Sequence, residues 1–208
     1  MRGVFLLLVL ACGLAGCTTR KNSATVELKD YEPRDGDFLF QSLPHNPLID
    51  TIEGSTESPF SHCGIVVNRA GKWKVIEAIG PVRETPLPLW IAQGRNNPYV
   101  AYRLKSPLAE KVPQIIAAAE RYEGRPYDIR YEFDDGKIYC SELLWKATRD
   151  ATGMKLGKVQ KLGDLKWQPY ESVIKGLEDG MLPLDREMIT PRAVSEDSQL
   201  EEVYRFRM

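Results

Sequence analysis

Histidine and cysteine are scarce in this sequence of 208 residues, which contains two histidines and four cysteines. It has no Cys-x-x-Cys pair and no regularly spaced series of Cys and His, so we expect no structural zinc site, no other metal and no cofactor. The net charge is −1, and charges of one sign do not form a run. We therefore expect no nucleic-acid partner and no polybasic membrane patch.

A long hydrophobic run is also missing, because the apolar stretch at the N-terminus is too short for a comfortable membrane span. This stretch follows a short basic start and ends in Leu14-Ala15-Gly16-Cys17. A basic start, an apolar stretch and small residues at the cut are typical of a signal peptide. The ending resembles a bacterial lipobox, which implies cleavage before Cys17 and a lipid on its sulfur. The alternative is an ordinary signal peptide with an incidental cysteine.

The expected domain organisation follows from this processing. We expect a signal peptide over residues 1–16, a lipidated N-terminus and polar tether over 17–30, and one domain over 31–208, with no repeat. A chain of this length is enough for one domain with a real core and hardly enough for two. By resemblance to bacterial sorting, Thr18 after the lipid cysteine favours the outer membrane. The expected location is the cell envelope, at the periplasmic face of that membrane.

Apolar stretches and turn signals predict an α+β fold, with an antiparallel sheet packed against helices. Strands are expected at residues 38–40, 61–67, 73–79, 99–104 and 202–206, and the second and third should pair as a hairpin around 68–71. Helices are expected at residues 89–93, 110–122 and 140–152, near 167–177, and from Thr190-Pro191 onward. Prolines and Gly54 predict a long loop over 41–60, in which His45 is expected to be solvated.

Cys140 is expected in the first turn of a helix. The turn signal Asp134-Asp135-Gly136 precedes it, and apolar residues at helical spacing follow it as far as Gly153. Unpaired backbone N–H groups and the positive end of the helix dipole lie at such a position, and both lower the pKa of a thiol. Cys140 is thus a candidate nucleophile. The alternative is a small buried cysteine at the start of an apolar helix face.

His62 and Glu77 are candidates for the base and the orienting group of a cysteine catalytic unit. His62 begins one strand of the expected hairpin, and Glu77 interrupts the apolar run of the other. Burying a carboxylate there is costly unless it is paired, and hairpin pairing brings Glu77 near His62. The alternatives are a histidine bonded to backbone and a glutamate paired with Lys or Arg. Alternation places Cys63 in the core, although a disulfide with Cys140 stays open.

Three segments of the sequence resemble the strands of NlpC-type cell-wall peptidases, which are papain-like enzymes. They are Gly36-Asp37-Phe38-Leu39-Phe40, Ser61-His62-Cys63-Gly64-Ile65-Val66-Val67 and Val75-Ile76-Glu77-Ala78. Tyr139-Cys140-Ser141-Glu142-Leu143 follows these strands, whereas ordinary members place the nucleophile helix before them. This order, with Gly124-Arg125-Pro126-Tyr127-Asp128 upstream, resembles the circularly permuted branch, the YiiX/YaeF-like amidases. The resemblance is clearest over residues 35–153.

The resemblance implies a circularly permuted papain-like fold and a cysteine amidase or peptidase. Carried over by position, Cys140 is the nucleophile and His62 the general base, and Glu77 stands where ordinary members often have a second histidine. The Tyr127 hydroxyl is a candidate for binding the substrate oxyanion, with a packing tyrosine as the alternative. The expected substrate is a peptidoglycan peptide or a related small amide, cleaved through a thioester.

Two other function classes stay open at this point. The permuted papain-like group also resembles lecithin–retinol acyltransferase-like proteins, so acyl transfer or hydrolysis of lipid amides is one alternative. An apolar groove at the cysteine would favour it, whereas a water-filled charged cleft would favour a cell-wall peptide. The other alternative is a non-catalytic envelope-binding protein on the same fold. The intact Cys140, His62 and Glu77 argue against a pure binder.

Overall fold

The computed structural model describes residues 30–207. The expected signal peptide over 1–16, the lipidation at Cys17 and nearly all of the tether lie outside the described residues. Within 30–207, no helix combines the length and the apolar character needed to cross a membrane.

A mixed sheet-and-helix architecture surrounds a six-stranded antiparallel sheet with the strand order β4-β3-β2-β1-β5-β8. Its strands are β1 (Phe38–Gln41), β2 (His62–Arg69), β3 (Lys72–Ala78), β4 (Val82–Pro86), β5 (Tyr99–Leu104) and β8 (Leu200–Phe206). The expected strands are confirmed, and so is the hairpin of β2 and β3. Strand β4 was not predicted.

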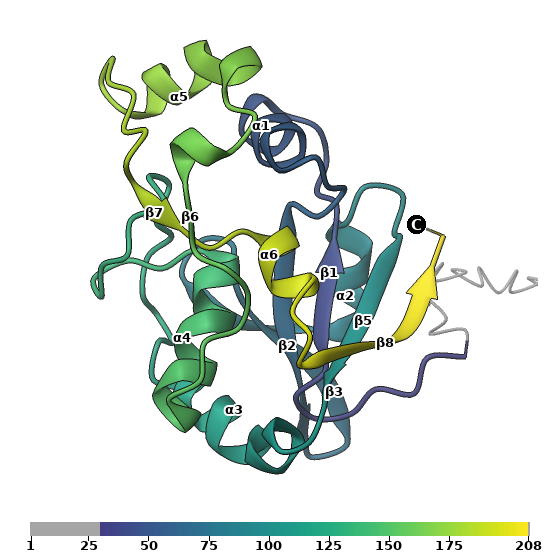
Figure 1. Cartoon of the computed structure of the whole chain (residues 1–208). Helices are drawn as coiled ribbons and strands as arrows, with labels where there is room; N and C mark the ends of the chain where they lie inside the picture. Colours follow the sequence, from purple (N-terminus) through teal and green to yellow (C-terminus); the bar gives the residue numbers. More distant parts are fainter. Residues whose placement is uncertain (1–29, 208) are drawn as a thin grey trace, which may run out of the picture.

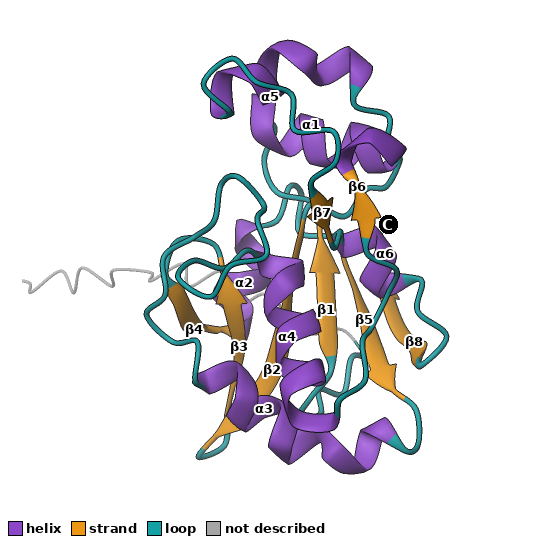
Figure 2. Cartoon of the chain, turned by 60° about the vertical axis from the view of Figure 1, so that its left-hand side comes forward, coloured by secondary structure: helices purple, strands orange, loops and turns teal. Residues whose placement is uncertain are grey.

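Helices cover both faces of this sheet (Figures 1 and 2). They are α1 (Pro47–Thr56), α2 (Leu87–Gln93), α3 (Val112–Glu120), α4 (Cys140–Thr152), α5 (Glu171–Leu177) and α6 (Pro191–Ser195). Helices α3 and α4 share one apolar core with the sheet residues Phe38, Cys63 and Ile65. On the other face, α2 packs on Leu39 and Val66. The α+β fold class is therefore confirmed.

Except for the 3-10 segment that directly precedes α3, the remaining elements lie near one end of the large sheet, where α1 and α5 run side by side (Figure 1). Short strands β6 (Gln160–Lys161) and β7 (Glu187–Met188) form a separate antiparallel pair. Three 3-10 segments span Leu108–Lys111, Leu162–Asp164 and Gln168–Tyr170. A third apolar cluster holds this end together through Leu162, Ile174 and Met188.

Residues 41–60 are not the long loop that the sequence predicts, because they contain helix α1. The Asn46 side chain accepts a hydrogen bond from the Ile49 backbone N–H at 3.0 Å, which caps the helix. Pro47 occupies the first turn, where its missing N–H costs nothing. The helix ends at Glu57, whose backbone is left-handed with φ of 51°. Pro47, which suggested a loop, is therefore part of the start of a short helix, and Gly54 lies within that helix.

The end of α4 and the start of α6 agree with their sequence signals, whereas the helix expected over 110–122 is shorter, because residues up to Lys111 form a 3-10 segment and α3 ends at Glu120. Helix α4 ends at Gly153 with φ of 74°, a conformation that glycine adopts at little cost. Helix α6 begins after Thr190, whose side chain accepts a hydrogen bond from the Ala193 N–H at 3.1 Å. Strand β8 pairs with β5 at the edge of the sheet, as predicted.

Candidate active site

Cys140 is the first residue of α4, as the sequence predicts, and it is almost fully buried. The Glu142 carboxylate accepts a hydrogen bond from the Tyr139 N–H at 3.3 Å, and the Ser141 hydroxyl donates to the Ile189 carbonyl at 2.8 Å. These bonds fix the first turn of the helix. The Cys140 thiol lies 3.9 Å from the carbonyl oxygen of Ser61, immediately before β2. The start of α4 thus meets the start of β2.

His62 and Glu77 form a buried pair, with His62 Nε2 and Glu77 Oε2 2.6 Å apart. Gly64 lies directly opposite Glu77 in the β2–β3 register. His62 is two residues before Gly64 on the same face of the strand, so the His62 and Glu77 side chains are diagonal neighbours. Glu77 also accepts hydrogen bonds from Thr85 Oγ1 at 2.5 Å and from Gln93 Nε2 at 2.8 Å. Glu77 belongs to β3, and partners from β2, β4 and α2 therefore hold its carboxylate in place.

The surroundings of His62 and Glu77 favour their pairing with each other over the alternative partners. Glu77 does have a basic neighbour, since Arg83 Nε lies 3.5 Å from its other carboxylate oxygen, but His62 is the shorter contact. The imidazole ring of His62 stacks on Trp90 with ring centres 5.8 Å apart. One ring nitrogen of His62 faces Glu77, and the ring also contacts the Cys140 thiol. The expected grouping of Cys140, His62 and Glu77 is present in the structure.

The electrostatics of this group favour a thiolate beside an imidazolium. The pKa of Cys140 is held well below its ordinary value because the Cys63 thiol and His62 hydrogen-bond to the thiolate, against the opposing effect of burial. Burial lowers the pKa of His62, but hydrogen bonds to Cys140 and Glu77 outweigh it and raise that pKa to about 9. At neutral pH the charged pair is therefore the stable form.

Cys63 lies in the core, as expected from strand alternation, but it is also a neighbour of the candidate nucleophile. Burial, and then its hydrogen bond to Cys140, raise the pKa of the Cys63 thiol well above its ordinary value. Cys63 therefore stays protonated and can donate to the Cys140 thiolate. Both cysteines are free, so the disulfide that the sequence left open is not formed in this structure.

Tyr127 lies beside the group, and a second tyrosine that the sequence analysis missed accompanies it. The Tyr127 and Tyr131 hydroxyl oxygens are 3.2 Å apart. Tyr131 has a left-handed backbone with φ of 56°. The buried Asp128 holds this turn by accepting hydrogen bonds from the N–H groups of Arg130, at 3.0 Å, and Glu132, at 2.5 Å. Burial and the charge on Cys140 both raise the pKa of Tyr127, which keeps its hydroxyl a hydrogen-bond donor.

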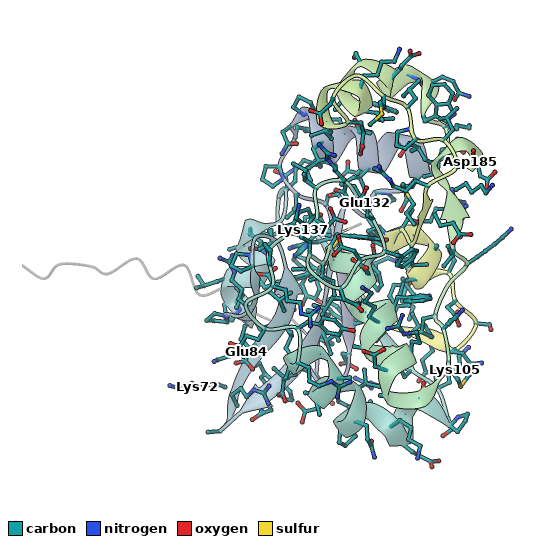
Figure 3. All side chains as sticks on the ribbon, turned by 90° about the vertical axis from the view of Figure 1, so that its left-hand side faces the viewer. Lys72, Glu84, Lys105, Glu132, Lys137 and Asp185 are labelled. Atoms are coloured by element: carbon teal, nitrogen blue, oxygen red, sulfur yellow. The ribbon has the colours of Figure 1, made fainter. Side chains whose placement is uncertain are left out.

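Glu132 and Lys137 belong to the segment between α3 and α4 (Figure 3). Lys146 of α4 ties the segment down by donating to the Asp134 carbonyl and to Asp135 Oδ1 at 2.9 Å. The signal that would have found Tyr131 is the spacing Tyr127-x-x-x-Tyr131 around Asp128. That pattern has no meaning until the turn at Asp128 is known.

An apolar pocket opens beside Cys140 and reaches toward the far end of the molecule, with a cavity volume of ≈ 80 Å³. Most of its apolar lining comes from α1, α5, the segment just before α5 and β7: Leu48, Ile52, Leu162, Leu165, Ile174, Leu177 and Met188. Glu178 and Arg186 also line it, but they pair with each other at 3.0 Å, and Arg186 donates to the Arg130 carbonyl at 2.7 Å. The pocket therefore offers apolar surface and few free polar groups.

His45 takes no part in this site. It is exposed, and it lies 2.6 Å from Asp50 on α1 and 2.9 Å from Arg95. Its surroundings agree with the solvated histidine that the sequence predicts. Among residues 30–207, no group of three or more His, Cys, Asp or Glu side chains is placed to hold a metal ion.

Comparison with known proteins identifies the family. Residues 32–204 match the model described as "Permuted papain-like amidase enzyme, YaeF/YiiX, C92 family". The chain belongs to this family. It is therefore a papain-like cysteine hydrolase of the amidase and peptidase class, with the circularly permuted papain-like fold that its sequence predicts.

Two similar proteins support this family assignment. The chain is 36% identical over 176 residues to the uncharacterized protein YiiX of Escherichia coli strain K12, covering 83% of this chain and 87% of that one. It is also similar to the crystal structure of yiiX from Escherichia coli O157:H7, with a TM-score of 0.80, 35% identity and coverage of 85% and 99% of the two chains. That structure's title calls yiiX a metalloprotein. The present chain's described residues show no donor set that fits a metal.

Proposed function

We propose that this member of the permuted amidase family hydrolyses an amide bond with Cys140 as nucleophile, His62 as general base and Glu77 as orienting group. One observation carries the proposal: His62 contacts the Cys140 thiol and lies 2.6 Å from Glu77, with both His62 and Glu77 buried. A nucleophile, a base and a group that orients the base are the parts of a triad. Thr85 and Gln93 fix Glu77 in turn.

In the proposed reaction, the Cys140 thiolate attacks the amide carbonyl while His62 carries the thiol proton. The backbone N–H groups at the start of α4 and the Tyr127 hydroxyl stabilise the oxyanion. The carbon–nitrogen bond then breaks, and the His62 imidazolium gives its proton to the leaving amine. A water molecule, deprotonated by His62, attacks the thioester and releases the acid and the Cys140 thiolate.

Two substrate classes follow from this chemistry. The first is the peptidoglycan-derived peptide or small amide to which the family resemblance points. The second is an amide with an apolar acyl group, as in a lipid amide, and the pocket beside Cys140 favours it. A peptidoglycan peptide is rich in charged and polar groups, whereas the pocket's own ion pair between Glu178 and Arg186 is already satisfied. An apolar lining contributes most binding free energy to a ligand with apolar surface to bury, such as an acyl chain.

We also propose that a lipid on Cys17 anchors the chain to the periplasmic face of the outer membrane. The thirteen residues from Cys17 to Lys29 span at most about 45 Å when extended. Such a tether keeps the domain close to the membrane surface. An enzyme held there meets both the cell wall and the acyl chains of lipids, so the anchor is compatible with both substrate classes.

The test is a series of para-nitroanilides with acyl groups of increasing length, run beside a set of cell-wall peptides. If the pocket binds the acyl chain, kcat/KM rises by up to about 4-fold for each buried methylene, which corresponds to about 0.8 kcal/mol. Cys140→Ala and His62→Ala abolish the hydrolysis. A flat response to chain length, with cleavage of cell-wall peptides, would instead select the peptide class.

A pocket variant and a matched control separate substrate fit from general damage. Ile52→Trp places a large ring in the pocket, so it lowers the rate for long acyl chains and spares short ones. Leu89→Trp makes a similar change on α2, at an exposed position outside the pocket, and leaves the whole series unchanged. Equal losses for short and long chains in Ile52→Trp would contradict acyl binding in the pocket.

A further inference from the structure

Cys63 and Cys140 both lie in the buried core beside the candidate active site. Ser61, His62 and Cys63 are consecutive, and the Ser61 carbonyl oxygen lies 3.9 Å from the Cys140 thiol. Because side chains alternate along a strand, His62 faces α2 and Trp90, and Cys63 faces α4. Cys63 and Cys140 belong to the same buried apolar cluster, and the Cys63 thiol is close enough to lower the pKa of Cys140.

The two thiols differ in how an oxidant reaches them. Cys140 lines the apolar pocket, so a small molecule in the pocket lies against this residue. Cys63 is fully buried and is not one of the residues that line the apolar pocket. Its environment keeps it protonated, whereas Cys140 is thiolate-prone. Thiolates react with peroxides and thiols hardly do, so oxidation starts at Cys140.

We propose that Cys63 is a resolving thiol, which converts peroxide-oxidised Cys140 into a reversible Cys63–Cys140 disulfide. The proposal rests on the reactive Cys140 of the proposed function, but it does not depend on which amide is cleaved. It makes the pair a modification site. Oxidation then stops the enzyme without destroying it, because the disulfide blocks further oxidation of Cys140.

The chemistry balances in two steps with hydrogen peroxide as the oxidant. The Cys140 thiolate attacks one peroxide oxygen, the oxygen–oxygen bond breaks, and hydroxide leaves with the proton of the His62 imidazolium as water. The sulfur is oxidised by two electrons to a sulfenic acid. The Cys63 sulfur then attacks the Cys140 sulfur, its proton goes to the departing hydroxyl, and a second water leaves. A dithiol reductant converts the Cys63–Cys140 disulfide back into two thiols.

The position of Cys63 relative to Cys140 determines what happens to the Cys140 sulfenic acid. Without a second thiol in contact, a sulfenic acid in an accessible pocket is oxidised further to a sulfinic acid, which ordinary thiols do not reduce. With Cys63 nearby, the disulfide needs no rearrangement of distant segments, because α4, which begins at Cys140, packs on β2, which carries Cys63. Resolution within the molecule is therefore favoured over both further oxidation and pairing with a second chain.

The test uses the full chain with Cys12→Ser and Cys17→Ser, so that Cys63 and Cys140 are the only cysteines. After hydrogen peroxide treatment and removal of the oxidant, intact mass and peptide mapping report the products. The expected product is a monomer lighter by two hydrogen atoms, in which the peptides of Cys63 and Cys140 are linked. Dithiothreitol restores both free thiols.

The matched variant Cys63→Ser keeps the shape of the side chain but removes the resolving sulfur. In it, Cys140 gains two oxygen atoms, and dithiothreitol does not restore the thiol. Cys63→Ala serves as a second variant if serine disturbs the core. In Cys140→Ser, Cys63 stays reduced under the same treatment, because it is buried and protonated.

The proposal is overturned if the parent chain accumulates sulfinic acid at Cys140 as fast as Cys63→Ser does, with no linked peptide. It also fails if the linked species is a dimer on a non-reducing gel. These readouts need no substrate, so they are separate from the amidase test. If Cys140 forms the disulfide but no acyl amide or peptide is cleaved, only the proposed function fails.

Discussion

Replacing Glu77 by Gln tests whether this carboxylate sets the charge state of His62 and, through it, that of Cys140. The pKa of His62 is raised to about 9, against an ordinary value of 6.5. That difference corresponds to about 3 kcal/mol in favour of the imidazolium, after the opposing cost of burial has been met. It is shared between Cys140 and Glu77, which both hydrogen-bond to the ring.

The expected effect of Glu77→Gln is a fall in the pKa of His62 by roughly 1 to 2, which corresponds to about 1 to 3 kcal/mol. Glutamine removes the negative charge and also mismatches the surrounding hydrogen bonds. Thr85 and Gln93 both donate to the Glu77 carboxylate, so an amide in its place must turn its NH₂ group toward one donor. The Cys140 pKa rises as its imidazolium partner is lost.

The assay is the rate of alkylation of Cys140 by iodoacetamide as a function of pH, in the chain without Cys12 and Cys17. In the parent, reactivity begins well below the ordinary thiol pKa of roughly 8.5, and a second step near pH 9 marks the loss of the His62 proton. Glu77→Gln brings the two steps together. If both steps stay in place in Glu77→Gln, the proposed relay from Glu77 to Cys140 is wrong.

Glu84→Gln is the matched control for this experiment. Glu84 lies on β4, beside β3 in the same sheet, near the edge of the molecule (Figure 3). Its carboxylate pairs with Arg69 at 2.6 Å and Lys74 at 2.8 Å, not with His62. The same loss of one charge at Glu84 therefore leaves the alkylation profile of Cys140 unchanged.

The remaining predictions concern the oxyanion and the start of α4. Tyr127→Phe lowers kcat by about 10²-fold with little change in KM, measured on the fastest amide of the series, whereas an unchanged kcat would make Tyr127 a packing residue. Burial, opposed by Lys146, raises the pKa of Glu142 to about 7, above its unfolded value of about 4.5. The folded protein therefore favours the protonated Glu142 carboxyl. The stability that this preference contributes is full below pH about 4.5 and is lost as pH rises through about 7. Urea unfolding at pH 5 and pH 8 shows a difference of about 3 kcal/mol from this group, which Glu142→Gln removes; an equal pH dependence in parent and variant would contradict this.

The grouping of Cys140, His62 and Glu77 was predictable because each residue stands out against its own segment. A cysteine after a turn and before a helix, and a glutamate inside an apolar strand, are both visible in the sequence. The uncertain part was the register of the hairpin. Asn68 settles it by accepting a hydrogen bond from the Gly71 N–H at 2.8 Å, which closes the turn so that Gly64 meets Glu77.

The parts that the sequence did not reveal depend on contacts between distant segments. Strand β4 was missed because Pro81 and Pro86 indicate a break, yet β4 lies at the edge of the sheet, where proline is tolerated. The pocket has no sequence signature, because its lining residues come from α1 and from segments more than a hundred residues later. Cys63 was correctly placed in the core, but its contact with Cys140 depends on how α4 packs on β2.

The two tasks of a hydrolase are encoded in separate stretches of this chain. Cys140, His62 and Glu77 come from the central sheet and the helix packed on it, whereas most of the pocket's apolar lining comes from α1 and residues 162–188. Mutations in those outlying stretches can change which molecule enters while the reacting groups keep their geometry. Substitutions in the pocket lining can therefore give the enzyme new substrates, and each intermediate sequence keeps the catalytic residues and their activity.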